Sequence, residues 1–229
     1  MLKLVEKAKR KIRAFISRIL TPPLETLQDC PDLFLVYRRL CIHPQLKRVP
    51  GGWIYRSEFY PDYLTVGGAG GAIFRVALRF CKGKGIDIGA GFWPLPGSIP
   101  IDLERGPGAG KTISSFQDNS LDYVFSSHCL EHIEDWKSAL RLWVTKLKYG
   151  GIIFIYLPHP KCEIWHPGSP FVGNGHKWIP TPNLILNVLK DLGCKVIDKD
   201  DGPDGMFSFY ICAQKSKKTA TMKNEKNAI

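Results

Sequence analysis

The chain has 229 residues, 44% of them hydrophobic and 23% charged, which is typical of one globular domain with a substantial core. Its formal net charge of +11 lies mainly at the two ends: residues 1–20 hold seven basic side chains and one acidic, and residues 215–229 hold five and one. The body between them is nearly neutral and carries no aromatic-and-basic RNA-binding motif, which argues against a nucleic-acid substrate.

Residues 1–22 predict a basic amphipathic helix that ends at the two prolines, Pro22 and Pro23. Such a helix either packs on the domain or lies on an anionic membrane surface. No apolar run reaches the ~18 residues of a membrane-spanning helix, and charges interrupt any signal-peptide core. The seven cysteines are scattered without a C-x-x-C pair, so we expect free thiols and a cytoplasmic protein, with possible peripheral membrane contact.

We expect residues 23–82 to form a helical and aromatic cap. Leu33 to Leu40 suggests a short helix, Val49 to Gly52 suggests a turn, and residues 72–80 predict a helix that packs on a sheet. The aromatic residues of this segment either cover a pocket or form a plain hydrophobic cap; they are Trp53, Tyr55, Phe59, Tyr60 and Tyr63.

The main domain is expected over residues 83–214, followed by a disordered basic tail over 215–229. Apolar runs predict strands over 85–88, 99–103, 121–125, 152–157, 194–197 and 206–213. We expect one helix to begin within 128–135, with Ser126 and Ser127 as caps, and to be closed by Lys148 to Gly151; another covers 183–192. Alternating strands and helices predict an α/β fold with a doubly wound, mostly parallel sheet and a C-terminal antiparallel strand pair.

The glycine turn from Gly89 to Gly91 follows a short apolar strand that contains Asp87. Glycine permits a left-handed backbone and the close approach of a ligand, and a buried acid is costly unless it has a partner. Ligands of such sheets bind beyond the carboxyl ends of the strands, where Asp102 is also expected. The third glycine of a dinucleotide fingerprint is replaced by Pro94, and Asp102 follows Gly91 too closely, so the pattern favours a ligand without a pyrophosphate.

Five segments in order resemble class I S-adenosylmethionine-dependent methyltransferases of the small-molecule type: Ile86 to Gly91, Ile101-Asp102, Ser115 to Val124, Ser127 to His132, and Leu147 to Gly151. The resemblance implies a Rossmann-like methyltransferase fold, S-adenosylmethionine as cofactor, and methyl transfer to a small molecule, sugar or lipid-linked glycan. The cofactor-binding residues that it implies are Asp87, Gly89, Ala90, Gly91, Asp102, Leu103, Ser115, Phe116 and Ser127.

Two features depart from that family. The connection over residues 92–99 is too short for a helical crossover, so we expect the first helix to be absent. The family's acid before Phe116, which contacts the adenine, is replaced by Gly110-Lys111-Thr112. A non-catalytic or accessory module of the same fold is therefore the alternative function.

Histidines supply the candidate catalytic groups, because an imidazole can accept a proton near neutral pH. His128 and His159 follow the ends of two strands and are the predicted catalytic residues, with His176 as a third candidate; each could instead make an ordinary loop hydrogen bond. His128-x-x-Glu131-His132 also matches an inverted zinc-peptidase motif, with the two histidines as zinc ligands and Glu131 as base, so a zinc hydrolase is the least favoured alternative function. Because the methyltransferase resemblance explains the same letters, no metal site is assigned. No oligomeric state is predicted.

Overall fold

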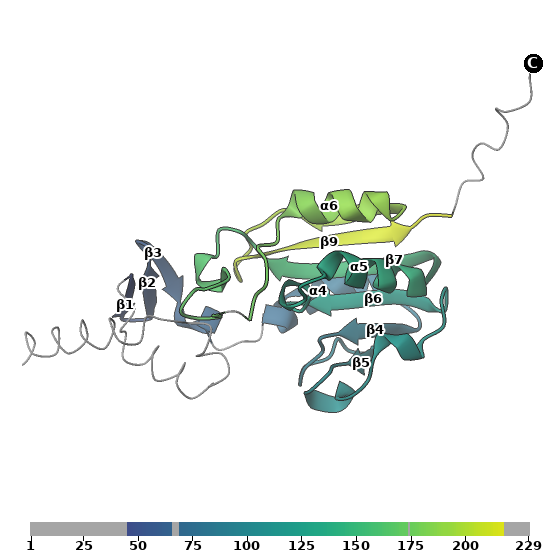
Figure 1. Ribbon diagram of the computed structural model, residues 1–229, viewed down its shortest axis with the longest axis horizontal. Helices are drawn as coiled ribbons and strands as arrows, with labels where there is room; N and C mark the ends of the chain where they lie inside the picture. The colour runs from purple at the N-terminus through teal and green to yellow at the C-terminus, as the bar shows by residue number, and fades with distance from the viewer. Residues whose placement is uncertain (1–44, 66–68, 174, 218–229) are drawn as a thin grey trace, which may run out of the picture.

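The computed structural model describes residues 45–65, 69–173 and 175–217. Within these ranges a small three-stranded antiparallel sheet precedes a six-stranded mixed sheet that forms the body of the molecule (Figure 1). The helices expected over 1–22 and 33–40, and the tail beyond residue 217, lie outside the described residues.

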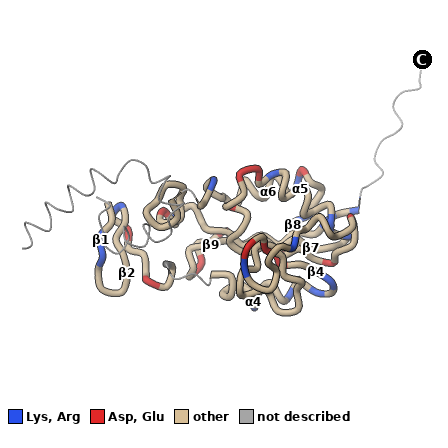
Figure 2. Tube along the Cα trace, turned by 60° about the horizontal axis from the view of Figure 1, so that its bottom comes forward, with Lys and Arg blue, Asp and Glu red and all other residues tan. Residues whose placement is uncertain are grey.

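Basic and acidic residues are interspersed over the described body, as its near-neutral composition predicts (Figure 2). The cysteines in the described ranges are free, as expected; they are Cys81, Cys129, Cys162, Cys194 and Cys212. No helix in this part of the chain has the length and apolar character needed to cross a membrane.

The six-stranded sheet has the order β5-β4-β6-β7-β9-β8. Strands β5, β4, β6 and β7 are parallel, whereas β9 is antiparallel to both of its neighbours. The doubly wound sheet with a C-terminal antiparallel pair is therefore confirmed. Its strands are β4 (Gly85–Ile88), β5 (Ile99–Ile101), β6 (Leu121–Ser127), β7 (Leu147–Pro158), β8 (Cys194–Asp200) and β9 (Ser208–Lys215).

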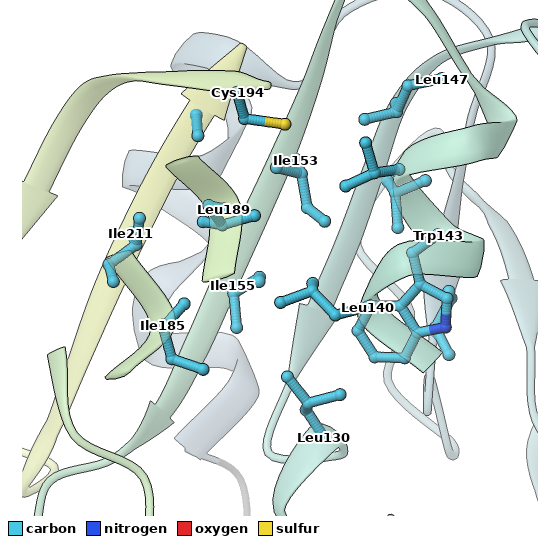
Figure 3. Close-up of a cluster of buried hydrophobic side chains, with 14 of the residues drawn as sticks. Leu130, Leu140, Trp143, Leu147, Ile153, Ile155, Ile185, Leu189, Cys194 and Ile211 are labelled. Atoms are coloured by element: carbon cyan, nitrogen blue, oxygen red, sulfur yellow. The ribbon is translucent and has the colours of Figure 1, made fainter. Parts of the chain in front are cut away.

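Helices cover both faces of this sheet because successive residues of its central strands point to opposite sides. Val124 belongs to the core on one face and its neighbour Phe125 to the core on the other. The helices are α4 (Ala69–Phe80) on the Phe125 face, and α5 (Trp136–Lys146) and α6 (Pro182–Asp191) on the Val124 face. Figure 3 shows the core on the Val124 face, where Leu140 and Trp143 of α5 and Leu189 of α6 pack against strands β7 and β9.

No α-helix connects β4 to β5, which confirms the expected loss of the first crossover helix. Pro94 and Pro96 cannot supply the backbone donors that a helix needs. The segment instead returns as a loop, in which the Leu95 amide donates to Asp87 Oδ2 at 2.7 Å. The chain between β4 and β5 is therefore a loop alone, without a helix to cover this side of the sheet.

The helical cap expected over 23–82 is wrong for residues 46–61, which form the three-stranded sheet. Its elements are β1 (Leu46–Val49), β2 (Gly52–Tyr55), β3 (Glu58–Pro61) and the following 3₁₀ turn η1 (Asp62–Thr65). The expected turn at Pro50 and Gly51 links β1 to β2, and Gly51 has φ +78°. Trp53 and Tyr55, two residues apart, are both buried on one face, and aromatic residues favour such pleated packing.

The region after β6 also differs from expectation. Residues 128–135 do not begin a regular helix: they contain the 3₁₀ turn η4 (Leu130–His132), and α5 begins only at Trp136. At the other end α5 stops at Lys146, and the expected stop over 148–151 lies inside β7. Gly150 has φ +83° there, next to a shift in the register between β6 and β7.

Candidate functional site

The glycine turn projects from the carboxyl end of β4 and is fixed to the end of β5. Gly89 and Gly91 have φ of +77° and +50°, the left-handed region that glycine tolerates best. The amides of Gly89 and Ala90 both donate to Ile101 O, at 2.9 and 3.2 Å. A Cβ on Gly89 would lie 2.4 Å from the Cβ of Cys129, whereas one on Gly91 would meet no atom within 4 Å. The turn thus packs tightly behind Gly89 and is open to a ligand at Gly91.

Asp87 holds this turn against the sheet. Its side chain is only 2% exposed, and Oδ2 accepts the Leu95 amide, which closes the loop that follows Gly91. Burial, together with the nearby charge of Asp102, raises the pKa of Asp87 to about 7, although the Leu95 hydrogen bond opposes the shift. The acid of the glycine motif therefore has an internal partner before any ligand binds.

Asp102 lies just beyond β5 and reaches the glycine turn. Its Oδ2 accepts the Gly91 amide at 3.0 Å, and its Oδ1 accepts the amides of Glu104 and Arg105 at 2.9 and 2.8 Å. Burial opposes ionisation, but these three backbone donors and the charge of Arg105 bring the pKa of Asp102 below its usual range. A carboxylate offers about four acceptor sites, and these amides occupy two on Oδ1 and one on Oδ2, so Oδ2 can still accept a ribose hydroxyl of a nucleoside.

A cavity of about 600 Å³ opens between this turn and the segment after β7. It brings together seven candidate residues named from the sequence: Asp87, Gly89, Ala90, Gly91, Ser127, His128 and His176. The Ser127 hydroxyl is buried there without a hydrogen-bond partner, as expected of a group that awaits a ligand. Of the aromatic residues expected to cover a pocket or form a cap, Tyr63 lines the cavity; the lining that the sequence did not predict includes Leu64 of η1, Phe74 of α4, Trp165, Phe171 and Met206.

Four predicted cofactor residues lie on the β5 side, outside this cavity. Asp102 reaches the turn as described, and Leu103 is 77% exposed beside it. The Ser115 hydroxyl donates to Thr112 O at 2.8 Å, and Phe116 packs partly buried against the core on the Val124 face. An adenosine bound at the turn would extend toward these residues.

His128 stands at the end of β6 with a left-handed backbone, φ +49°. Its amide donates to Tyr156 O at 2.9 Å, which turns the chain back over the end of the sheet. The ring contacts Ser208 Oγ through Nε2 at 3.0 Å and Glu131 Oε1 through Nδ1 at 3.5 Å. The other predicted catalytic residue, His159, does not line the cavity; its Nδ1 accepts the Lys161 amide at 3.1 Å.

Glu131 is the most deeply buried charge of the site. It is 0% exposed, and both of its carboxylate oxygens lack a hydrogen-bond partner. Its neighbours are the imidazoles of His128, at 3.5 Å, and His176, whose Nε2 lies 3.8 Å from Oε1. Burial opposes its ionisation, but contact with His128 and the nearby imidazoles bring the pKa of Glu131 below its usual range.

His176 and His132 complete this cluster, with ring centroids 4.6 Å apart. His176 is buried, and burial lowers its pKa to about 4, so this imidazole is neutral near pH 7. The sequence placed His176 in the loop after β7 but gave no sign that it would meet Glu131, 45 positions earlier. The letters H-x-x-E-H supplied the only signal, and they identified two of the three members of this cluster, Glu131 and His132.

Comparison with known proteins identified one family model and solved structures of similar fold. Residues 64–155 match the family model described as a methyltransferase domain. No match was found among curated proteins. Two solved structures with similar folds are S-adenosylmethionine-dependent methyltransferases from Archaeoglobus fulgidus and Mesorhizobium loti. The Archaeoglobus fulgidus structure has 20% sequence identity and a TM-score of 0.48, and the match covers 63% of this chain and 92% of that chain. The Mesorhizobium loti structure has 18% sequence identity and a TM-score of 0.49, and the match covers 65% of this chain and 98% of that chain.

The site fits S-adenosylmethionine, a cofactor that requires no phosphate-binding subsite. Gly91 leaves open space at the turn, Asp102 is an ionised acceptor for ribose hydroxyls, and the unpartnered Ser127 hydroxyl points to a ligand between them and the cavity wall. These three residues lie within the segment that matches the family model, and the sheet places the strands that carry them next to one another. This chain therefore has a Rossmann-like α/β fold, and its residues 64–155 match a methyltransferase domain.

Proposed function

We propose that this chain transfers a methyl group from S-adenosylmethionine to a small molecule, sugar or lipid-linked glycan. One observation carries the proposal: a single cavity of about 600 Å³ joins the glycine turn of the cofactor site to a wall of ionisable and aromatic side chains. That wall includes His128, Glu131 and Trp165. Such a cavity lets a cofactor and an acceptor share one enclosed space.

The size and chemistry of the cavity support a small polar acceptor. Small-molecule sites commonly enclose roughly 300 to 1,000 Å³. The aromatic rings of Trp93, Trp165 and Phe171 offer flat apolar surface, and His128 and Glu131 offer hydrogen-bonding groups beside it. A sugar ring presents apolar C–H faces and polar hydroxyls, so it matches both kinds of lining.

The protein contributes mainly orientation. When bound, the cofactor supplies an electrophilic methyl group, and the transfer is favoured by holding that methyl and the acceptor atom roughly 3 Å apart. Asp87 and Asp102 fix the turn at one end of the cavity, and the segment from Trp165 to His176 forms the other wall. His128 is the candidate proton acceptor: its ring lies between Glu131 and Ser208, and an acceptor hydroxyl can replace its Ser208 contact.

Cofactor binding is the first test. S-adenosylhomocysteine should raise the melting temperature of the wild-type chain and bind measurably by calorimetry. Asp102→Ala should abolish both effects, because it removes the ribose acceptor and frees the Gly91 amide. Glu104→Ala is the matched control, since it removes a nearby acid whose backbone, not side chain, bonds to Asp102. Absence of any shift with millimolar ligand would contradict the proposal.

Methyl transfer is the second test. Methyl-labelled S-adenosylmethionine should label at least one member of a panel of free sugars, nucleotide-linked sugars, lipid-linked glycans and small phenols. His128→Asn should reduce the rate much more than it weakens S-adenosylhomocysteine binding. Cofactor binding with no transfer to any member of a broad panel would favour the alternative, a non-catalytic module of the same fold.

A further inference from the structure

Three side chains at the wall of the cavity converge on one point. Glu131, His132 and His176 each offer a ligand atom, and these atoms all lie within 4.8 Å of one another. We propose that they bind a divalent transition-metal cation such as Zn²⁺. The three residues come from two segments far apart in the chain, the turn after β6 and the loop after β7.

Glu131 provides the strongest reason to expect a cation. Both of its oxygens are buried without a hydrogen-bond donor in the described structure. An ionised carboxylate removed from water is costly unless it is paired or coordinates a metal. The surrounding imidazoles at 3.5 and 3.8 Å are too distant to hydrogen-bond it well. A cation between Glu131 and these rings would satisfy the carboxylate.

The two histidines already have the tautomer that a metal requires. His176 Nδ1 lies 2.6 Å from Trp165 O, and His132 Nδ1 lies 2.9 Å from Gly175 O. A carbonyl oxygen can only accept, so each Nδ1 carries a proton and Nε2 is the nitrogen left to bind a metal. Metal-binding histidines typically donate their other ring N–H to a carbonyl in this way, which fixes the ring.

The backbone holds the two segments together independently of any ligand. The Lys177 amide donates to Glu131 O at 2.8 Å, and Trp178 Nε1 donates to Leu130 O at 3.2 Å. The Trp178 ring also stacks on Trp136 at the start of α5, with centroids 4.3 Å apart. Glu131 and His176 are therefore positioned by packing, whereas the exposed His132 is held by its hydrogen bond to Gly175 O and is the ligand with the most freedom to move.

Two imidazoles and one carboxylate form a common ligand set for zinc sites that keep an open position. Ligand bonds of about 2.0 to 2.2 Å place ligand atoms roughly 3.4 Å apart in a tetrahedral site. Rotation of the exposed His132 ring can close much of the remaining gap. His128 stays outside the ligand set, because its Nε2 contacts Ser208 and its Nδ1 faces Glu131.

The open position of such a metal would face the cavity, which all three ligands line. There it could hold an acceptor oxygen and lower the pKa of an acceptor hydroxyl. This part of the inference rests on the proposed methyl transfer, but the metal site itself does not. Metal binding must therefore be measured directly and without cofactor.

The test uses the full chain, stripped of metal and titrated with Zn²⁺ against a chromophoric chelator. We expect one tight equivalent in the wild type. Glu131→Gln, His132→Asn and His176→Asn should each lower the affinity at least ~100-fold, since even supporting residues of metal sites contribute 10- to 100-fold. His159→Asn, a histidine outside the cavity, is the matched control and should retain wild-type affinity.

Co²⁺ substitution identifies the ligands. We expect visible absorption bands of a nitrogen and oxygen site, and their loss in the exposed-residue variant His132→Asn, which should not disturb folding. The proposal is overturned if the wild type binds no equivalent, if the three variants bind as tightly as the wild type, or if thiolate bands assign the metal to a cysteine. Calorimetry with S-adenosylhomocysteine on the same samples separates loss of this metal site from failure of the methyltransferase proposal.

Discussion

Asp87 shows how a single buried acid can serve the fold and the site at once. Its carboxylate lines the cavity and accepts the Leu95 amide, which fixes the loop after the glycine turn. Burial and the charge of Asp102 favour the protonated form. The sequence identified this acid as one that needs a partner, and the partner is the loop itself rather than only a ligand.

The raised pKa of Asp87 predicts how stability changes with pH. The pKa is about 7 in the folded chain and 3.8 ordinarily, so between these values the folded state holds a proton that the unfolded state has released. The stability that this proton supplies is complete below pH ~4 and is lost as pH rises through 7. At ~1.4 kcal/mol per unit, the loss is at most roughly 4 kcal/mol.

Asp87→Asn removes this dependence, because an amide keeps the acceptor oxygen for Leu95 but does not titrate. We expect the free energy of unfolding of the wild type to fall relative to that of the variant between pH 5 and pH 8, by a few kcal/mol at most. Denaturant unfolding of both proteins without cofactor, at the same salt concentration, measures the difference. Parallel pH curves would show that Asp87 does not carry the effect.

Elements whose residues alternate between two buried faces, or form one helical stripe, are the ones that the sequence predicts well. Strands β4, β6 and β9 and helix α6 appear within a few residues of the expected positions. The start of α5 was misplaced because Ser126 and Ser127 look like caps in the sequence. In the structure both end β6, and the Ser126 hydroxyl donates instead to Ile88 O at 3.0 Å.

The cavity wall could not be predicted because long-range packing creates it. Leu130 and Glu131 meet Lys177 and Trp178 through backbone and indole hydrogen bonds, and no local pattern encodes that contact. The glycine turn was predictable, since its conformation depends on adjacent residues. Local chemistry therefore predicted the glycine turn of the candidate site, and tertiary contacts form the opposite wall of the cavity.

The true cap of α5 is Asp135, whose side chain accepts the Ser138 amide at 3.2 Å. Asp135→Ala leaves that donor unsatisfied and should lower the free energy of unfolding by about 1 kcal/mol, within the usual 0.5 to 2 for N-cap residues. Glu134→Ala, the exposed neighbour, is the control and should change stability by less than ~0.5 kcal/mol. Equal effects of the two substitutions in urea unfolding would contradict the assignment of the cap.

At the scale of the molecule, the small N-terminal sheet shapes the site from outside the main domain. Its core includes Trp53, which meets Phe171 edge to face with centroids 5.5 Å apart. Tyr60 is fully buried, and its hydroxyl accepts the Glu163 amide at 3.2 Å. These contacts support the segment after β7, whose Trp165 and His176 line the cavity. The aromatic residues thus act as a cap and as support for the pocket wall.

The uneven charge of the whole chain leads to a prediction about the membrane. Residues 1–20, which lie outside the described residues, combine an apolar stripe with seven basic side chains, and we propose that they bind anionic lipid surfaces. Each basic residue near such a surface contributes about 1 kcal/mol at physiological salt. The full chain should therefore sediment with phosphatidylserine vesicles, much less with neutral vesicles, and progressively less as salt rises.

Two variants, each of which loses four positive charges, test which end of the chain binds the vesicles. Replacing Lys9, Arg10, Lys11 and Arg13 by glutamine should reduce vesicle binding on the order of 100-fold or more, because about 4 kcal/mol of attraction is lost. Replacing Lys217, Lys218, Lys223 and Lys226 in the C-terminal tail removes the same charge without an apolar stripe nearby, and should have a much smaller effect. Equal losses in both variants would mean that net charge alone attracts the protein, and salt-insensitive or absent binding would refute the membrane proposal.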